Sequence, residues 1–571
     1  MTAFEKEGIT LGEIRPLLDG MVPPHTIVSE SPDRIEWIIE GGGALLLTVK
    51  DDGDLTRLSM SAHDLHEAPL SLGIRFEAVS GVRRYLRNGY HSWDGSFFAE
   101  PGTPAGDAPA GKEPTIGFAM TALLPANAEG AVLLGFERHD RFQNRFRFGG
   151  DMAAMTIDAE TLLDRTGATE TETLLLYADP DVENTLIRWS EKVAAASPIV
   201  PRIPEKRIRG WCSWYNLYAA IDETNIEEHL RAAITYRETH DVDLDIFLID
   251  DGFTPEMGDW LTVKPQFPRG MTPVLADIAD AGFTPGLWIA PFMVGNRSRL
   301  YEEHPDWVVR DRDTGQPLIQ MAFYGEFRWH KRSEEYYVLD ITHPGAEAYI
   351  RQVFRTWTQD WGARYFKTDF MFFGAEYGPD RAAWHQPGLS RIAIWRRMGA
   401  IIREEIGDAL WLGCGCPLWA SVGLVDAVRI GRDVGVKWSG DQSAESLLRD
   451  QATRNHAAGR LWQADPDCIL LRSRFHDLTD AQVESLALLA WLSGGVLMTS
   501  DHLGELSPRR AALFDALAGL EVAECRYPSL GKDDASIAQR TLLADGRSIA
   551  LQLDTGSGES HCIDSAGNVW P

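Results

Sequence analysis

The stretch LDIFLIDDGF (residues 244–253) decides how the middle of this chain is expected to fold, because an apolar run of strand length ends in two adjacent acids. The stretch RYFKTDF (364–370) repeats this pattern with a lysine and an acid near its end. Segments of helical periodicity are predicted around these runs, over 223–239, 270–281, 344–361 and 388–405. Short strands that alternate with helices predict parallel strands closed into a (β/α)8 barrel, the TIM barrel.

Nine runs compete for the eight strands of this barrel. Besides the two above, they are RGWCSWY (209–215), PGLWIAPF (285–292), YYVLD (336–340), LWLGCG (410–415), AVRIGRD (427–433), DPDCIL (465–470) and GGVLMTSD (494–501). We predict that GGVLMTSD lies outside the barrel as a connector.

The barrel is expected over 207–510, with a β domain on each side. Residues 1–195 consist of short alternating segments such as RIEWIIE and ALLLTVK between Gly, Pro, Asp and Asn clusters, which predicts an N-terminal antiparallel β-sandwich. A loop is predicted inside it over 101–115, and a helix over 181–196 closes it. Residues 520–571 return to short strands around an ADGR turn, which predicts a small C-terminal antiparallel β domain.

Composition excludes several classes of protein. Acidic residues outnumber basic ones 84 to 55, and the net charge of −29 disfavours binding to nucleic acid or to an anionic membrane. The six cysteines show no spacing typical of structural zinc, and we predict no metal and no cofactor. No leader-like segment opens the chain and no run of about 18 apolar residues occurs, so a reduced, cytoplasmic protein is the expectation.

Charged residues gather where the predicted barrel strands end, and in a TIM barrel those ends carry the chemistry. Asp250 and Asp251 follow one strand, and Lys367 and Asp369 lie on the same face of another. A lone acid at such a place is more often a helix cap or a turn residue. Two adjacent buried acids need two sets of partners, which favours a functional site.

Three further strand-end residues belong to the candidate site, namely Cys414, Arg429 and Asp433. The alternative for Arg429 and Asp433 is a surface ion pair that contributes little. Nineteen tryptophans are present, and Trp211, Trp214, Trp288 and Trp438 lie on or just after strand ends. Each is more often a core residue, but several at one mouth suggest a surface on which a sugar ring stacks.

Two carboxyl groups at one concave mouth most simply perform glycoside hydrolysis, in which one attacks the anomeric carbon and the other donates and accepts a proton. We expect Lys367 to keep the neighbouring Asp369 ionised, and Asp433 is the candidate for the acid/base. A Schiff-base aldolase that uses Lys367 is a remote alternative, since it leaves the acids unexplained. A sugar-binding protein without turnover is a third class.

The order of the motifs resembles glycoside hydrolase family 36, the alpha-galactosidases, in a clan shared with family 27. The motifs are GWCSWY, LIDDGF followed by GDW, GLWIAPF, YFKTDF, LGCGCP and RIGRDVGVKW, within residues 207–505. The resemblance implies a compact bacterial type and a retaining alpha-galactosidase acting on melibiose- or raffinose-type oligosaccharides.

The resemblance also implies a role for each site residue. It makes Asp369 the nucleophile and Asp433 the acid/base. It makes the substrate-binding residues Asp250 and Asp251 for the 4- and 6-hydroxyls, Lys367 for the 3- and 4-hydroxyls, Cys414 and Arg429 near the 2-hydroxyl, Trp214 and Trp288 as aromatic walls, and Trp93 of NGYHSW from an N-terminal loop.

Departures from the family pattern leave some points open. GCGCP stands where longer members have SCSGGG, which leaves aglycone preference and assembly into a homo-oligomer open. The insertion QMAFYGEFRWHKRSEEYYVLD (320–340) is long and aromatic, so the donor sugar can differ from galactose. N-acetylgalactosamine, which needs space at the 2-position, is the leading alternative.

Overall fold

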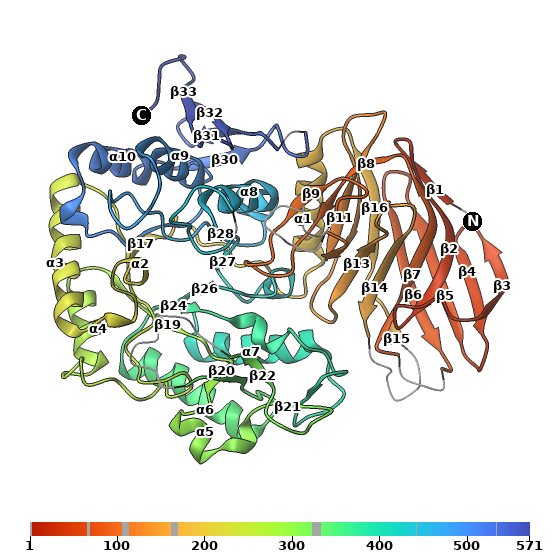
Figure 1. The fold of residues 1–571 in the computed structure, drawn as a ribbon, viewed down its shortest axis with the longest axis horizontal. Coiled ribbons are helices and arrows are strands. Elements are labelled where there is room, and N and C mark those ends of the chain that lie inside the picture. Colours follow the sequence, from red (N-terminus) through yellow and green to blue (C-terminus); the bar gives the residue numbers. More distant parts are fainter. Residues whose placement is uncertain are drawn as a thin grey trace.

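A computed structural model describes residues 3–65, 69–104, 114–161, 169–322, 333–440, 442–532 and 534–571. It contains a β-sandwich, a parallel barrel and a small antiparallel sheet in chain order (Figure 1). These are the three parts that the sequence predicts. Most of the loop expected over 101–115 and the aromatic part of the 320–340 insertion lie outside the described residues.

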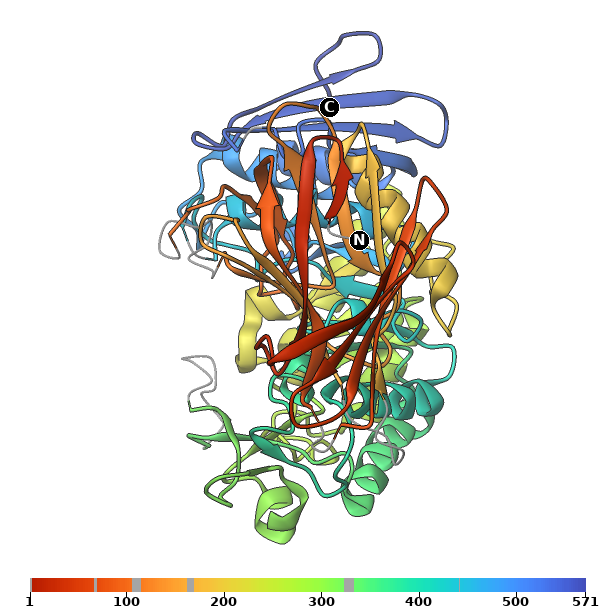
Figure 2. The same cartoon turned by 90° about the vertical axis from the view of Figure 1, so that its right-hand side faces the viewer.

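Two antiparallel sheets form the N-terminal sandwich, which faces the viewer in Figure 2. The first sheet runs β1 (Ala3–Lys6), β2 (Ile9–Leu18), β7 (Ser71–Ser80), β14 (Met155–Glu160), β13 (Asn144–Phe148), β10 (Ile116–Phe118). The second runs β3 (His25–Ser31), β4 (Arg34–Ile39), β5 (Ala44–Asp51), β6 (Thr56–His63), β16 (Leu174–Asp179), β12 (Ala131–Phe136), β11 (Met120–Pro125), β8 (Val82–Arg87), β9 (Phe97–Ala99), with β15 (Thr169–Glu170) beside β6.

Alternation of apolar and polar residues explains this packing, because successive side chains of a strand face opposite sides. In β5 every second residue from Leu45 to Val49 is buried, and these side chains share one core with Leu72 and Phe76 of the other sheet. Helix α1 (Val182–Ala196) follows, capped by the Asp181 side chain, and leads to the barrel.

Eight parallel strands form the barrel, in the order β28 (Gln463–Asp465), β27 (Ala427–Arg429), β26 (Leu410–Gly413), β24 (Tyr365–Thr368), β19 (Thr284–Ile289), β18 (Ile246–Ile249), β17 (Arg209–Cys212), β29 (Leu497–Thr499). The last and first strands of this order meet through a hydrogen bond of 2.8 Å from the Val496 amide to the Ala464 carbonyl. The predicted barrel is therefore confirmed.

Two of the nine candidate strands exchange roles relative to our prediction. GGVLMTSD supplies β29, which pairs with β17 and is a barrel strand rather than a connector. YYVLD supplies β23 (Tyr336–Val338), which pairs antiparallel with β20 (Met293–Gly295) and β22 (Ile319–Met321) outside the barrel. Both runs are short and apolar, and the difference lies in their partners, which a local pattern does not encode.

Helices surround the barrel, and the small C-terminal sheet lies at one side of it (Figure 1). The helices are α2 (Trp214–Leu217), α3 (Glu223–His240), α4 (Met271–Asp280), α5 (Arg299–Glu303), α6 (Pro344–Arg355), α7 (Arg391–Ile406), α8 (Ala444–Arg454), α9 (Asp480–Trp491) and α10 (Pro508–Ala518). A two-stranded sheet joins β21 (Arg310–Asp311) to β25 (Ala382–Ala383), and the C-terminal sheet runs β30 (Val522–Arg526), β31 (Ser536–Leu543), β32 (Ser548–Asp554), β33 (Ser560–Asp564). Within the described part of the chain, no helix is long and apolar enough to cross a bilayer.

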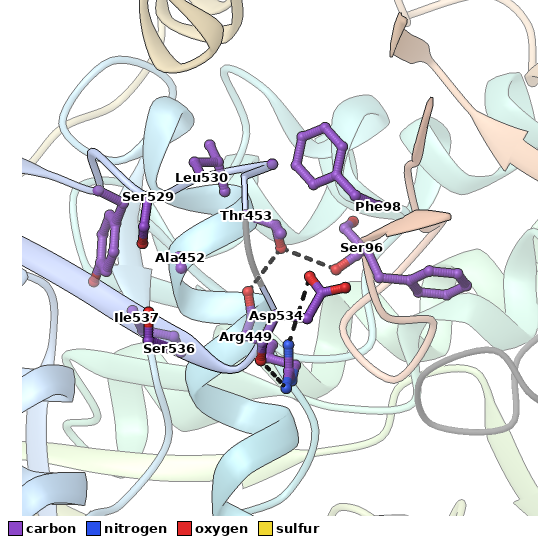
Figure 3. A pocket seen from close by; sticks show the side chains of 13 residues that line it. Ser96, Phe98, Arg449, Ala452, Thr453, Ser529, Leu530, Asp534, Ser536 and Ile537 are labelled. Atoms are coloured by element: carbon purple, nitrogen blue, oxygen red, sulfur yellow. Dashed lines mark hydrogen bonds and ion pairs between the residues drawn. The ribbon is translucent and has the colours of Figure 1, made fainter. Parts of the chain in front are cut away.

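A cavity of about 50 Å³ marks the place where the three parts of the chain meet (Figure 3). Its walls come from β9, from α8 and from the segment around β31. The Thr453 hydroxyl of α8 donates to the Ser96 carbonyl, and Arg449 donates to the Asp534 carbonyl. Helix α8 is thus fastened both to the sandwich and to the C-terminal sheet.

Candidate active site

The barrel strands bring the predicted acids and the predicted lysine to one mouth. Lys367 on β24 reaches past β19 and pairs with Asp250, which follows β18, at 2.8 Å between Nζ and Oδ2. Both side chains are almost fully buried. The Cys212 thiol donates to the same Asp250 oxygen at 3.4 Å, and Asp251, also buried, donates its amide to Asp250 Oδ1 at 2.8 Å.

The sequence predicts that Lys367 and Asp369 lie in the mouth together and that the lysine favours the ionised form of Asp369. Burial raises the pKa of Asp369, and the charge of Lys367 does lower it. The ion-pair partner of Lys367, which was not predicted, is Asp250. The negative charge of Asp250 outweighs burial and raises the pKa of Lys367 well above its usual value. The lysine is therefore held as an ammonium ion.

Asp369 is held by donors on both carboxylate oxygens. Trp288 Nε1 of β19 donates to Oδ2 at 3.0 Å, and the Phe370 amide donates to Oδ1 at 2.7 Å. Burial raises the pKa of Asp369, Lys367 opposes this rise, and the charge of Asp433 adds to it. The two carboxyl groups therefore lie close enough to influence one another.

Asp433 lies at the open side of the mouth, with its side chain about half exposed. Arg429, the last residue of β27, donates from Nη2 to Asp433 Oδ1 at 2.7 Å. Trp93 of the N-terminal part donates from Nε1 to the same oxygen at 3.3 Å. The sandwich thus contributes a residue to the mouth of the barrel.

Close packing holds the Trp93 ring in this position. A side chain at Gly415 would place its Cβ 2.4 Å from the ring, and Gly415 has φ +63°, where glycine is favoured. The loop that carries Trp93 is fixed by an ion pair of 2.7 Å between Arg87 and Asp94. Arg454 of α8 donates to backbone carbonyls of the same loop.

The remaining predicted residues also lie at this mouth or beside it. Trp214 begins α2, is half buried and contacts the Tyr218 ring edge to face. Cys414 follows β26, and Arg429 Nη1 donates to its sulfur at 3.7 Å. Burial raises the pKa of the Cys414 thiol well above its usual value, so the thiol stays protonated.

Two of the tryptophans noted in the sequence lie elsewhere. Trp211 is buried, stacks on Phe247 and donates to the Asp501 carbonyl at 2.9 Å. Trp438 donates to the Thr555 carbonyl at 2.7 Å and joins the barrel to the C-terminal part. Both are therefore packing residues.

Sequence reasoning missed Asp467 and Tyr215. Asp467 lies in DPDCIL just after β28, so the strand-end rule applied to this run would have pointed to it. Its carboxylate accepts from Arg429 Nη2 at 2.6 Å and from the Tyr215 hydroxyl. Burial raises the pKa of Asp467 to about 6, although Arg429 opposes the rise.

Across the described ranges, no three His, Cys, Asp or Glu side chains are grouped so that they could hold a metal ion. The mouth therefore offers carboxylates, one ammonium, one guanidinium and indole N–H groups to a ligand. Such a set suits a neutral polyhydroxyl ligand, whose hydroxyls both donate and accept hydrogen bonds.

Comparison with known proteins bears on the class to which this fold and site belong. Residues 212–381 match the Melibiase family model. The chain is 26% identical over 225 residues to "Probable alpha-galactosidase C" of Aspergillus flavus, which covers 35% of this chain and 26% of that one. It is 30% identical over 115 residues to an alpha-galactosidase of Escherichia coli, covering 19% and 14%. The matches thus span about a quarter or less of these relatives.

Solved structures match along nearly the whole chain. An alpha-galactosidase from Thermus thermophilus in complex with p-nitrophenyl alpha-D-galactopyranoside has a TM-score of 0.67 and 23% identity, covering 96% of this chain and 100% of that one. The GH36 alpha-galactosidase AgaA from Geobacillus stearothermophilus has a TM-score of 0.63 and 14% identity, covering 96% and 79%. At 23% and 14% identity these two structures show a shared fold, and with the Melibiase match over residues 212–381 they agree with the resemblance to family 36 alpha-galactosidases.

Proposed function

We propose that this protein is a retaining alpha-galactosidase that hydrolyses terminal alpha-D-galactosides of the melibiose or raffinose type. The observation that carries the proposal is one mouth that holds a buried carboxylate, Asp369 after β24, and a half-exposed one, Asp433 after β27, with β26 between these two strands. The relatives named above are alpha-galactosidases, and one of the Thermus thermophilus structures contains stachyose.

In the first step, the Asp369 carboxylate attacks the anomeric carbon while Asp433 gives its proton to the leaving oxygen. The bond to the aglycone breaks as the bond to Asp369 forms, and a glycosyl ester results. In the second step, Asp433 takes a proton from water, which attacks the anomeric carbon and releases galactose and free Asp369. Trp288 and the Phe370 amide aim the Asp369 carboxylate through their hydrogen bonds.

The donor sugar is proposed from the buried acceptors. Asp250 and Asp251 offer carboxylate oxygens as further acceptors for an axial 4-hydroxyl and a 6-hydroxyl of galactose, and a sugar with an equatorial 4-hydroxyl would lose such a hydrogen bond. Lys367, held by Asp250, is a fixed donor for the 3- and 4-hydroxyls. Cys414 leaves the 2-position to a bare hydroxyl rather than to an acetamido group.

The aldolase alternative loses support from the state of Lys367. A Schiff-base lysine needs a free amine, which enzymes obtain by lowering its pKa. Here the buried carboxylate of Asp250 raises the pKa instead. For location we propose the cytoplasm, which the six free thiols support.

A panel of aryl alpha-glycosides tests the proposal, with anomeric NMR of the first product. We expect turnover of the galactoside above all others and release of alpha-galactose first. Preference for the N-acetylgalactosaminide would revise the donor, and beta-galactose as first product would contradict retention.

A further inference from the structure

Asp467 lies just after β28 and shares Arg429 with Asp433, and four donors hold its carboxylate. Oδ2 accepts from Arg429 Nη2 at 2.6 Å, from the Val434 amide at 2.7 Å and from the Tyr215 hydroxyl. Oδ1 accepts from the Cys468 amide at 2.7 Å. The side chain is only 2% exposed, so these contacts take place away from bulk water.

The backbone at Asp467 is strained, which indicates that its neighbours hold the residue in place. Its φ of +80° is uncommon for a residue other than glycine. The Asp467 amide donates to Asp465 Oδ1 at 2.9 Å. The Ile430 amide donates to the Asp465 carbonyl at 3.0 Å, which links this turn to the segment that carries Asp433.

Arg429 is shared between two carboxylates. The same nitrogen, Nη2, donates to Asp433 at 2.7 Å and to Asp467 at 2.6 Å. With Asp433 as its only partner, the buried guanidinium would direct its whole positive charge at that carboxylate. A general acid must instead carry a proton when the substrate arrives.

We propose that Asp467 is a positioning residue that balances the charge of Arg429 and anchors Val434, so that Asp433 can hold a proton and point at the leaving oxygen. This inference rests on the proposed function, because it explains how Asp433 serves as an acid. Asp467 itself touches no reacting atom in this account.

Asp467 has the charge state that this role requires. Burial raises its pKa to about 6, so the carboxylate is ionised above that pH. Other titratable or charged groups that face Asp433 and Asp467 come from five elements or the turns after them, and they are Tyr215, Tyr218, Lys367, Asp369, Cys414, Arg429, Asp465 and Cys468. Among them, Arg429 is the cation in direct contact with both carboxylates.

The substitution Asp467→Asn tests the inference, since asparagine keeps the size and one acceptor but removes the charge. In the pH profile of kcat/KM, the alkaline limb reports the deprotonation of the acid in the free enzyme. We expect this limb to move down by about one pH unit in the variant. Aryl galactosides with poor leaving groups should lose about tenfold more activity than those with good ones, because they depend on protonation.

Trp93→Phe is the matched comparison, because it removes an indole donor from Asp433 rather than a charge from beneath Arg429. Loss of that donor disfavours ionised Asp433, so the alkaline limb should move up. Opposite shifts in the two variants support the proposal. If the substitutions only made the site less ordered, the alkaline limb would move in the same direction in both variants or in neither of them.

Tyr215→Phe provides the test if Asp467→Asn fails to fold, as judged by circular dichroism and melting temperature. Loss of the hydroxyl donor raises the pKa of Asp467, so the alkaline limb should move down by a smaller amount. The inference would be overturned if the folded Asp467→Asn variant had its alkaline limb at the same pH as the wild type. If that variant does not fold, the same result for a folded Tyr215→Phe variant would overturn it. In either case the proposed function would stand. Absence of turnover by the wild-type protein would refute both.

Discussion

Individual side chains at the barrel mouth differ most in what holds them. Lys367 and Asp250 satisfy each other in a buried pair, while Asp369 depends on the indole of Trp288 and a backbone amide. Asp433 is half exposed and contacts Arg429 and Trp93. The two carboxyl groups thus have different environments, as the proposed nucleophile and the proposed acid require.

Trp288→Phe should weaken the nucleophile. The indole N–H lowers the pKa of Asp369, so its loss raises that pKa further and moves the acidic limb of kcat/KM to higher pH. At a pH below this acidic limb, we expect kcat/KM of the variant to be about tenfold lower than that of the wild type. Trp411→Phe is the control, because the Trp411 indole donates at 2.8 Å to the Thr368 hydroxyl, which is neutral and precedes Asp369 at the end of β24. A similar limb shift in both variants would contradict the assignment.

Asp433→Ala should separate substrates by leaving group. Aryl galactosides with acidic phenols leave without a proton, so they should retain activity, while poor leaving groups should lose about a hundredfold or more. The slope of log(kcat/KM) against leaving-group pKa measures this. An equal loss for all leaving groups would argue against Asp433 as the acid.

Several site residues could be predicted from the sequence because charge at a strand end is visible locally. Asp250, Asp369 and Arg429 all follow this rule. Asp467 follows it too, but its run, DPDCIL, begins with acids and contains proline, which hides the strand end. The ion pair of Lys367 with Asp250 was not predicted, because the pleat gives the face of a side chain but not the residue of another strand that it reaches.

At the scale of elements, α8 connects the three parts of the chain. Arg454 near its end donates to the His91 and Ser92 carbonyls at 3.3 Å, to the Asp94 and Ile430 carbonyls and to the Ser96 hydroxyl. These contacts hold the loop with Trp93 and the start of the segment with Asp433. One buried arginine thus orders both sides of the mouth.

Arg454→Met should disorder this junction. It leaves buried carbonyls without a donor, so the free energy of unfolding should fall by about 3 kcal/mol, and KM should rise because Trp93 is no longer fixed. Denaturant unfolding and steady-state kinetics measure the two effects. Arg449→Met, on the same helix but more exposed, is the control: it removes the contact to the Asp534 carbonyl and none to the Trp93 loop, so KM should stay the same and the free energy of unfolding should fall less. Unchanged KM in a folded Arg454→Met variant would contradict the role of the loop.

Helices and most strands could be predicted because their periodicity is local. The predicted helix over 181–196 matches α1, and the run at 244–253 contains β18. The roles of YYVLD and GGVLMTSD could not be predicted, because strand length and apolarity are equal in the two. Only their partners, β20 and β22 for one and β17 for the other, distinguish them.

The whole molecule combines a site made by the barrel with one residue, Trp93, supplied by the sandwich. Its net charge of −29 would not repel the neutral sugar that we propose as substrate. Buried acids inside this charged molecule tie its stability to pH. Glu172, in the sandwich, is such a group, and burial raises its pKa to about 8.

Glu172→Gln should stabilise the protein in mild alkali. The folded state holds the Glu172 proton up to pH about 8, whereas the unfolded chain loses it near its usual value of 4.5, so stability falls as pH rises through this window. Glutamine mimics the protonated acid and removes this loss. We expect the melting temperature of the variant to exceed that of the wild type at pH 8.5 and not at pH 4. An equal difference at both pH values would contradict the assignment.

The covalent intermediate tests the central claim most directly. Reaction with an activated 5-fluoro-alpha-galactosyl fluoride, followed by peptic digestion and mass spectrometry, should locate a fluorogalactosyl group on Asp369. The Asp369→Asn variant should carry no adduct. An adduct on another carboxylate, or turnover of aryl alpha-galactosides by Asp369→Asn at the wild-type rate, would contradict the account.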